Sequence, residues 1–393
     1  MVAVVAAQFF NSLADNALLI AAIGLLLERQ AAAWMTPALR LFFYLSYVLL
    51  APFAGALADA WPKGRVMLVA NLIKLGGCLL LLTHIHPLIA YALIGCGAAA
   101  YSPAKYGILP ELVPAERLVV ANAWIEISTV ASILLGVMLG SYLLDAGRNV
   151  PHWVQSDAAN AAALLAMLYA VAVLCIAMIP ANAASNPHAL TRPASLLRDF
   201  YDSFLTLWRD PAGQISLAVT SLFWSAAAAL QFIVLRWAME TLQLTLAQAG
   251  LLQGAVALGM VAGAMLAARS IPVQRALHVL PLGCAMGVIL LLMPWISNVS
   301  MAALLLGLTG LLAGVFLVPM NALLQQRGQA LMHTGQSVSI QNFNENLASL
   351  SVLGVSGALL GTHASITSII VGLGLAVSIA MLAIVGRQKL HAR

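Results

Sequence analysis

Six charged side chains interrupt the long apolar stretches of this chain, and their residue types are the ones that could do chemistry there. Placing a charge inside a bilayer costs at least about 2.5 kcal/mol, so such a residue normally faces a polar cavity or a partner. Three of the six are acids and three are bases, so they could largely neutralise one another. They are Asp15, Lys74, Lys105, Glu126, Arg236 and Glu345.

Motifs that would indicate catalysis are absent from the sequence. It contains no phosphate-binding glycine loop, nucleophile elbow or HExxH motif. Cys78, Cys96, Cys175 and Cys284 stand singly in apolar stretches, without the spacing of metal ligands, and we interpret them as small packing residues. We therefore expect no enzyme, no cofactor and no metal.

The sequence allows different roles for the individual charged residues. Asp15 lies midway along an apolar stretch with Asn16 beside it and no neighbouring base in sequence, which favours a binding role. Lys105 could form a salt bridge with Glu126, at a similar depth on the next helix, or extend along its helix towards water. Arg236 lies beside Trp237 near a helix end, where it is either a ligand contact or an interfacial anchor.

A polar stripe marks the stretch near residue 345. Gln341, Glu345 and Ser349 recur every four residues, with Asn342 and Asn346 on an adjoining strip. Lipid cannot satisfy these groups, so the stripe must face protein or water. The alternatives are a substrate path and hydrogen bonds that join helices.

A short turn at residues 55–65 combines glycine with charge in the run GALADAWPKGR. It resembles the loop signature of the major facilitator superfamily, with one extra residue between Asp59 and Gly64. In that family the acidic residue of the loop faces the neighbouring half and helps to hold one conformation. The resemblance implies a gating role for Asp59 and Arg65, and the alternative is a solvated turn.

The elements that must position these residues are membrane-spanning helices. Hydrophobic residues make up 62% of the 393 residues and charged residues only 8%, and the mean hydropathy is +0.97. A soluble domain carries roughly 25% charged residues, so a water-soluble fold is excluded. Stretches of about 20 apolar residues recur as twelve predicted spans: 2–27, 37–58, 66–84, 87–109, 118–144, 157–179, 212–238, 247–268, 277–296, 299–325, 333–360 and 363–385.

These spans predict an all-α membrane protein of two six-helix halves, 1–179 and 212–393, joined by a polar linker, 180–211. The i, i+4 pairs Asn122/Glu126 and Gln341/Glu345 recur in the fifth and eleventh spans, as a parallel repeat would give. In the linker, apolar residues at helical spacing predict an amphipathic helix on the membrane surface: Leu197, Phe200, Phe204 and Trp208.

Basic residues indicate the orientation of the spans. If the N-terminus is cytoplasmic, the outside loops keep only Arg29 and Arg148, with Arg40 just inside the second span. This asymmetry predicts that both termini are cytoplasmic. The net charge of +5 then reflects topology and not nucleic-acid binding. The inside residues are Lys63, Arg65, Arg117, Arg192, Arg198, Arg209, Arg269, Arg275, Arg327, Arg387, Lys389 and Arg393.

Glycines at helical spacing predict close helix crossings. They are Gly136 and Gly140, then Gly250, Gly254, Gly259 and Gly263, then Gly354, Gly357 and Gly361.

Several runs resemble the bacterial lysophospholipid transporter family of the major facilitator superfamily, in order and over essentially the whole chain. They are AQFFNSLADNALL, GAAAYSPAKYGILPEL, NAWIEISTVASILLG, SLFW, VPMNALLQQRG and IQNFNENLAS. The resemblance implies an inner-membrane flippase that moves lysophosphatidylethanolamine and lysophosphatidylglycerol from the periplasmic to the cytoplasmic leaflet. There a partner acyltransferase/acyl-carrier-protein synthetase reacylates them.

The same resemblance assigns functional positions to Asp15, Asn16, Lys105, Glu126 and Glu345. One departure concerns the seventh span, where the family places an arginine at the position of Gln231 and this chain carries Arg236. The five-residue step climbs about 7.5 Å, so Arg236 replaces that side chain only if it reaches back.

Two other classes of protein compete with this interpretation. A proton-coupled exporter of amphipathic drugs would carry its proton on Asp15, Glu126 or Glu345. A membrane scaffold without transport activity would need every buried charge to be a structural pair. The physical fit favours a lysophospholipid, because few, balanced charges in apolar walls suit one phosphate headgroup and one acyl chain.

Overall fold

The computed structural model describes residues 1–32, 34–83, 85–147, 157–180, 183–191, 193–361 and 365–391. Regular structure in these ranges is helical, without a β-strand. The first half of the sequence forms α1 (Val2–Glu28), α2 (Met35–Ala60), α3 (Lys63–Leu80), α4 (Pro87–Gly107), α5 (Leu109–Leu112), α6 (Leu118–Gly147) and α7 (Asp157–Ala177). Then follow α8 (Leu196–Arg209), α9 (Pro211–Glu240), α10 (Leu246–Ser270), α11 (Leu280–Leu292), α12 (Val299–Leu331), α13 (Thr334–Gly361) and α14 (Ile366–His391). The predicted all-α fold is confirmed.

Nine segments of the described chain are long and apolar enough to cross a membrane. They are Val2–Glu28, Met35–Ala60, Pro87–Leu112, Ala115–Leu144, Pro211–Glu240, Gln248–Ser270, Val273–Trp295, Val299–Leu331 and Ile366–Lys389. The other three predicted spans are also helices, namely α3, α7 and α13. α3 is less apolar because it carries Lys63, Arg65 and Lys74, and α13 because it carries the polar stripe. The chain is a multi-pass membrane protein.

The helices form two compact units, which we describe separately. The first unit contains Met1–Leu112, Ser128–Phe204 and Met332–Phe343, and the second contains Val113–Ile127, Leu205–Leu331 and Asn344–Arg393. The chain therefore passes from one unit to the other within α6, α8 and α13, and also between helices after Leu112 and after Leu331. The division into halves at 180–211 stays a prediction. Among the residues used for orientation, Arg148, Arg192 and Arg393 lie outside the described part of the chain.

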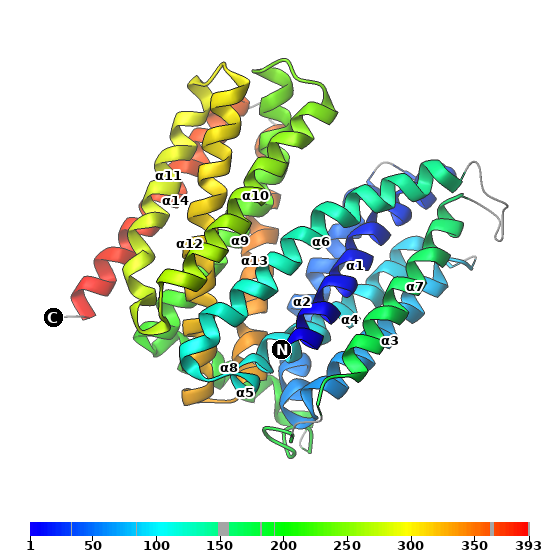
Figure 1. The fold of residues 1–393 in the computed structure, drawn as a ribbon, viewed down its shortest axis with the longest axis vertical. Helices are drawn as coiled ribbons and strands as arrows, with labels where there is room; N and C mark the ends of the chain where they lie inside the picture. Colours follow the sequence, from blue (N-terminus) through cyan, green and yellow to red (C-terminus); the bar gives the residue numbers. More distant parts are fainter. Residues whose placement is uncertain are drawn as a thin grey trace. The chain divides into compact units, whose positions relative to one another are not determined.

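The first unit is a bundle in which α1 packs on α7, α2 on α4, and α3 on both α4 and α7 (Figure 1). Its core is built from apolar faces that lose all contact with solvent, including Leu18, Leu39, Ile94 and Tyr169. Gly136 and Gly140 of α6 lie against α1, where a methyl group on Gly140 would come within 2.7 Å of the Ala17 carbonyl oxygen. The predicted close crossing at these two glycines is confirmed.

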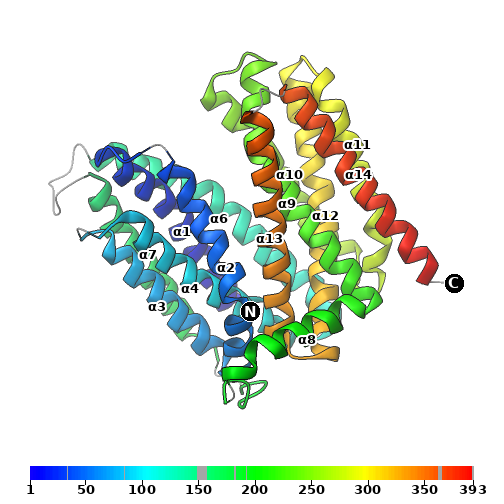
Figure 2. The ribbon, with the colours of Figure 1, turned by 180° about the vertical axis from the view of Figure 1, so that it is seen from behind.

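α8 is the amphipathic helix predicted in the linker. Phe200 and Phe204 lie edge-on to Phe343 of α13, with ring centroids 5.6 and 6.2 Å apart. Figure 2 shows α8 lying across the first turns of α13. Leu197 and Tyr201 face outward. The apolar face is thus used in part for packing, and a membrane-surface location of the outer face stays a prediction.

The second unit depends on close backbone contact between α10 and α12, with α11 against α14 and α9 against α12 and α14. A methyl group on Gly259, Gly263, Gly310 or Gly314 would overlap the backbone of the facing helix, so only glycine fits. Around Gly250, Gly254 and Gly354 no atom from another part of the described chain lies within 4 Å of such a methyl group. Of the predicted crossings, Gly259 and Gly263 are confirmed, and the crossings at Gly250, Gly254 and Gly354 stay predictions. The surroundings of Gly357 and Gly361 lie outside what the structure describes.

The close contact between α10 and α12 predicts that adding one methyl group to it lowers stability. Gly310→Ala should lower the thermal unfolding temperature of the purified protein, because its Cβ would overlap the Val256 carbonyl oxygen. Overpacking of this kind costs roughly 1–3 kcal/mol. Gly254→Ala, on α10 in open surroundings, is the matched control and should unfold like the native protein. Equal unfolding temperatures for the two variants would contradict the assignment.

Candidate functional site

A buried ion pair joins α1 to α3 inside the first unit. The Lys74 ammonium lies 2.5 Å from Asp15 Oδ2 and donates a second hydrogen bond, of 3.0 Å, to Asn11 Oδ1. Tyr169 of α7 donates its hydroxyl proton to Asp15 Oδ1 at 2.6 Å. The Lys74 ammonium also lies over the rings of Tyr101 and Tyr169, at 5.3 and 6.0 Å from their centroids. Asp15 therefore has a charge partner and a hydrogen-bond partner.

This pair corrects one premise of the sequence interpretation. Asp15 has no base near it in sequence, but α3 brings Lys74 to it across 59 positions. Asn16, predicted beside Asp15 as a polar contact, donates to the Ser12 backbone oxygen of its own helix at 2.8 Å. The Asn16 amide is thus engaged within α1, and the side chain that completes the site is Lys74.

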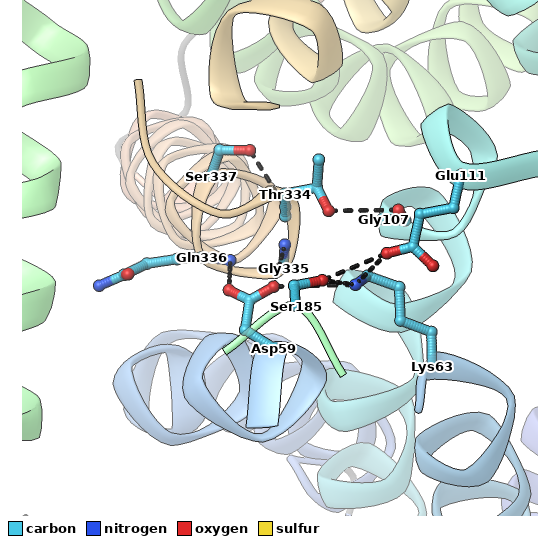
Figure 3. Close-up of polar contacts among 9 residues, drawn as sticks. All are labelled: Asp59, Lys63, Gly107, Glu111, Ser185, Thr334, Gly335, Gln336 and Ser337. Atoms are coloured by element: carbon cyan, nitrogen blue, oxygen red, sulfur yellow. Dashed lines mark hydrogen bonds and ion pairs between the residues drawn. The ribbon is translucent and has the colours of Figure 1, made fainter. Parts of the chain in front are cut away.

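Asp59, at the end of α2, caps the N-terminus of α13 (Figure 3). Its carboxylate accepts the backbone N–H of Gly335 at 2.9 Å and that of Gln336 at 2.8 Å. These amides belong to the first turn of α13, which has no intrahelical acceptors and carries the positive end of the helix dipole. A methyl group on Gly335 would come within 2.6 Å of Asp59 Oδ1, so glycine permits this approach.

The buried cation beside this cap is Lys63. Its side chain is 0% exposed, and its ammonium lies 2.5 Å from Glu111 Oε1, 2.5 Å from Ser185 Oγ and 3.9 Å from Asp59 Oδ1. The linker closes the group, because the Asn186 N–H donates to the Asp59 backbone oxygen at 2.8 Å. The sequence singled out Arg65 instead. Arg65 is exposed, and its guanidinium carbon lies 5.3 Å from the centroid of the Trp61 ring.

Lys105 and Gln341 lie buried in the same unit. Lys105 is near the C-terminus of α4, with its ammonium 4.0 Å from the Tyr106 ring centroid. Two bonds tie α4 to α13 close by: Thr334 Oγ1 donates to the Gly107 backbone oxygen at 3.2 Å, and Ser102 Oγ donates to Asn342 Oδ1 at 3.3 Å. Part of the polar stripe of α13 thus serves hydrogen bonding between helices.

Glu126 lies in the second unit and is fully buried. Asn321 of α12 donates to its Oε1 at 3.2 Å. One turn earlier, Asn122 and Gln325 exchange two side-chain hydrogen bonds of 2.9 and 2.8 Å. α12 supplies both amides at i, i+4 spacing, a signal that the sequence interpretation missed. The bridge from Lys105 to Glu126 stays a prediction, because the two residues belong to different units.

Glu345 also belongs to the second unit, one turn after Gln341 on α13. The Ser349 hydroxyl donates to its backbone oxygen at 2.7 Å, so this member of the predicted stripe bonds within its own helix.

Arg236 lies at the end of α9 and forms an i, i+4 ion pair with Glu240. Its Nε lies 2.5 Å from Glu240 Oε1, and the Arg236 side chain is 43% exposed. The backbone oxygen of Gln231, where the family arginine was expected, accepts from Gln253 Nε2 at 2.5 Å. Arg236 is therefore held by a carboxylate on its own helix, which the sequence interpretation overlooked.

A half-buried carboxylate outside the membrane spans also caps a helix. Asp210 caps the N-terminus of α9 through the Gly213 N–H at 2.8 Å and binds the Arg327 guanidinium through both oxygens. Burial raises the pKa of Asp210, but the hydrogen bonds from Arg327 and Gly213 outweigh it and hold the pKa below its ordinary value.

Metal sites in proteins use His, Cys, Asp and Glu side chains. In the described residues, no three of these side chains are grouped as metal ligands. All four cysteines are free thiols.

Comparison with known proteins places this arrangement in a family. The profile of the Major Facilitator Superfamily matches residues 4–352. The Lysophospholipid transporter LplT of Yersinia enterocolitica is 42% identical over 356 residues, 90% of this chain and 86% of the relative. That of Yersinia pestis strain Pestoides F is 40% identical over 370 residues, 94% and 89% of the two chains.

Solved structures agree on the fold. The human organic anion transporter MFSD10 (TETRAN) superposes with a TM-score of 0.73 at 17% identity, over 97% of this chain and 98% of the other. The transporter FucP in the outward conformation superposes with a TM-score of 0.73 at 14% identity, over 98% and 97%. This chain belongs to the major facilitator superfamily and, within it, to the lysophospholipid transporter family.

The cap on α13 predicts a loss of stability on neutralisation. Asp59→Asn should lower the thermal unfolding temperature, because one of two capping oxygens becomes an NH₂ group that cannot accept. Lost N-caps cost roughly 0.5–2 kcal/mol. Arg65→Gln, on the same turn but exposed, is the control and should unfold like the native protein. If both variants unfold alike, Asp59 does not hold α13.

Proposed function

We propose that this protein moves lysophospholipids, chiefly lysophosphatidylethanolamine and lysophosphatidylglycerol, from the periplasmic to the cytoplasmic leaflet of the inner membrane. The observation that carries the proposal is the 42% identity to a relative named Lysophospholipid transporter LplT over 90% of this chain. The sequence runs that resemble this family hold Asp15, Lys105, Glu126 and Glu345.

The charge distribution supports such a substrate. A lysophospholipid needs a polar path for its headgroup and an apolar path for one acyl chain. The described interior offers few charges, and those of Asp15 and Lys74 cancel in a pair. A sugar phosphate would need a cavity wall richer in charge. It has no acyl chain whose burial could offset the cost of removing its polar groups from water.

Roles for the individual residues follow from chemistry. The phosphate needs a cation or strong donor, for which we propose Lys105 near one membrane face and Arg236 towards the other. Asp15, Asn16, Glu126, Gln341 and Glu345 would supply acceptors and donors along the path. Asp59 would gate the protein by holding α13, and its exposed neighbour Arg65 would act on the same turn.

The setting of this activity is part of the proposal. Both termini and the 180–211 linker would lie in the cytoplasm, between an N-terminal half at 1–179 and a C-terminal half at 212–393. The returned lysophospholipid would be the substrate of an acyltransferase/acyl-carrier-protein synthetase.

Reconstitution into liposomes with labelled lysophospholipid tests the transport directly. We expect the native protein to move both lysophospholipids between leaflets faster than protein-free liposomes do. Transport of amphipathic drugs that requires an imposed proton gradient, without movement of lysophospholipid, would favour the proton-coupled exporter.

Substituting Lys105 and Arg236 one at a time tests the two proposed contacts with the headgroup phosphate. Lys105→Gln should slow both lysophospholipids by about tenfold or more, because a charge-assisted hydrogen bond contributes about 1.5–3 kcal/mol and both lipids carry a phosphate. Arg236→Gln should slow them too if Arg236 leaves Glu240 for the phosphate. Native rates in Arg236→Gln would make it an interfacial anchor, and native rates in Lys105→Gln would refute its assignment.

Labelling of a single cysteine tests the orientation. In a variant with Cys78, Cys96, Cys175 and Cys284 replaced by alanine, Leu190→Cys should resist an impermeant thiol reagent in whole cells and react after lysis. Ready reaction in intact cells would place the linker in the periplasm and contradict the charge asymmetry.

A further inference from the structure

The two members of the Asp15–Lys74 pair differ in their access to solvent. The Lys74 side chain is 1% exposed and that of Asp15 is 17% exposed. The Lys74 ammonium is enclosed by Asp15, Asn11 and the rings of Tyr101 and Tyr169. A ligand that reaches this pair therefore meets the carboxylate and not the ammonium.

The carboxylate keeps unused acceptor capacity. Asp15 Oδ2 accepts from Lys74 and Oδ1 from the Tyr169 hydroxyl. An ionised carboxylate has about four lone-pair sites, so two remain for a donor on its exposed side. Lys74 and Tyr169 fix the orientation of those sites, because each holds one oxygen.

The stem of Lys74 is itself held by a close helix contact. Gly97 of α4 faces it, and a methyl group there would come within 2.6 Å of Lys74 Cγ and 2.6 Å of the Ala70 backbone oxygen. The contact of α3 with α4 thus sets the position of the ammonium. Around Gly76, which like Lys74 belongs to α3, no atom from elsewhere in the described chain lies within 4 Å of an added methyl group.

We propose that Lys74 is a positioning residue that holds the Asp15 carboxylate ready for the ammonium group of an ethanolamine headgroup. This inference rests on the proposed function. A zwitterionic lysophospholipid brings a cation to the partly exposed carboxylate, whereas a glycerol headgroup brings only hydroxyl groups. Both headgroups can donate a hydrogen bond to the carboxylate, but only the ethanolamine ammonium adds the Coulombic attraction of an opposite charge, so the site favours ethanolamine over glycerol.

Exchanging the two charges tests this proposal. The double variant Asp15→Lys/Lys74→Asp keeps an ion pair but exposes its cation instead of its carboxylate. Asn11 can turn its amide to donate, and the Tyr169 hydroxyl can accept, so the surroundings suit the exchanged pair. Transport of lysophosphatidylethanolamine and lysophosphatidylglycerol is measured in liposomes that contain equal amounts of folded protein.

We expect the ratio of lysophosphatidylethanolamine to lysophosphatidylglycerol transport to fall about tenfold or more in the double variant. An unchanged ratio would overturn the proposal and make the pair purely structural. If the native protein moves neither lipid, the proposed function fails instead, so the two failures are distinguishable.

A second variant decides the matter if the double variant does not accumulate in the membrane. Gly97→Ala displaces Lys74 without changing any charge, and Gly76→Ala is its control on the neighbouring helix. We expect Gly97→Ala to lower the same ratio several-fold, with Gly76→Ala at the native ratio. A native ratio in Gly97→Ala would overturn the proposal.

Discussion

A charge that leaves water for the interior of a membrane protein needs a partner of opposite sign, and this requirement organises the helices of the first unit. Lys74 on α3 can be buried only because α1 presents Asp15 to it. Lys63 is buried at the start of the same helix because Glu111 and Ser185 receive it. α3 is thus fixed at two points along its length by ionic contacts.

Capping of the N-terminus of α13 is the second interaction that orders this unit. α13 begins at Thr334, and the first turn of any helix leaves its N–H groups without intrahelical acceptors. Asp59 accepts two of these groups, and Thr334 itself donates to α4. The start of α13 is therefore bound to α2 and α4, which the sequence separates from it by more than two hundred positions. A gate built on Asp59 would act by releasing these bonds.

Hydropathy predicted the helices well, because a bilayer demands long apolar stretches whatever they pack against. The loop signature located Asp59, and glycine spacing located the contacts at Gly136, Gly140, Gly259 and Gly263. The partners of the charges were beyond sequence reasoning. Lys74 and Asp15 are 59 positions apart, and no local pattern links them.

The choice between Lys63 and Arg65 could not be predicted either. Lys63 and Arg65 lie two positions apart, one on each side of Gly64, and only the direction of α3 decides which one is buried. Arg236 was assigned by analogy with a position five residues earlier, although Glu240 lies within reach one turn later. For both basic residues, the three-dimensional arrangement of the helices determines the partner, and the residue types alone do not.

A double-mutant cycle on thermal unfolding tests most directly whether charge pairing holds the interior together. Removing one partner of a buried pair typically costs about 3–5 kcal/mol, whereas replacing both is often close to neutral. Asp15→Asn and Lys74→Met should each lower the unfolding temperature, and the double variant should unfold closer to the native protein than either one does. Strictly additive losses in the double variant would show that the two charges do not depend on each other and would contradict this account.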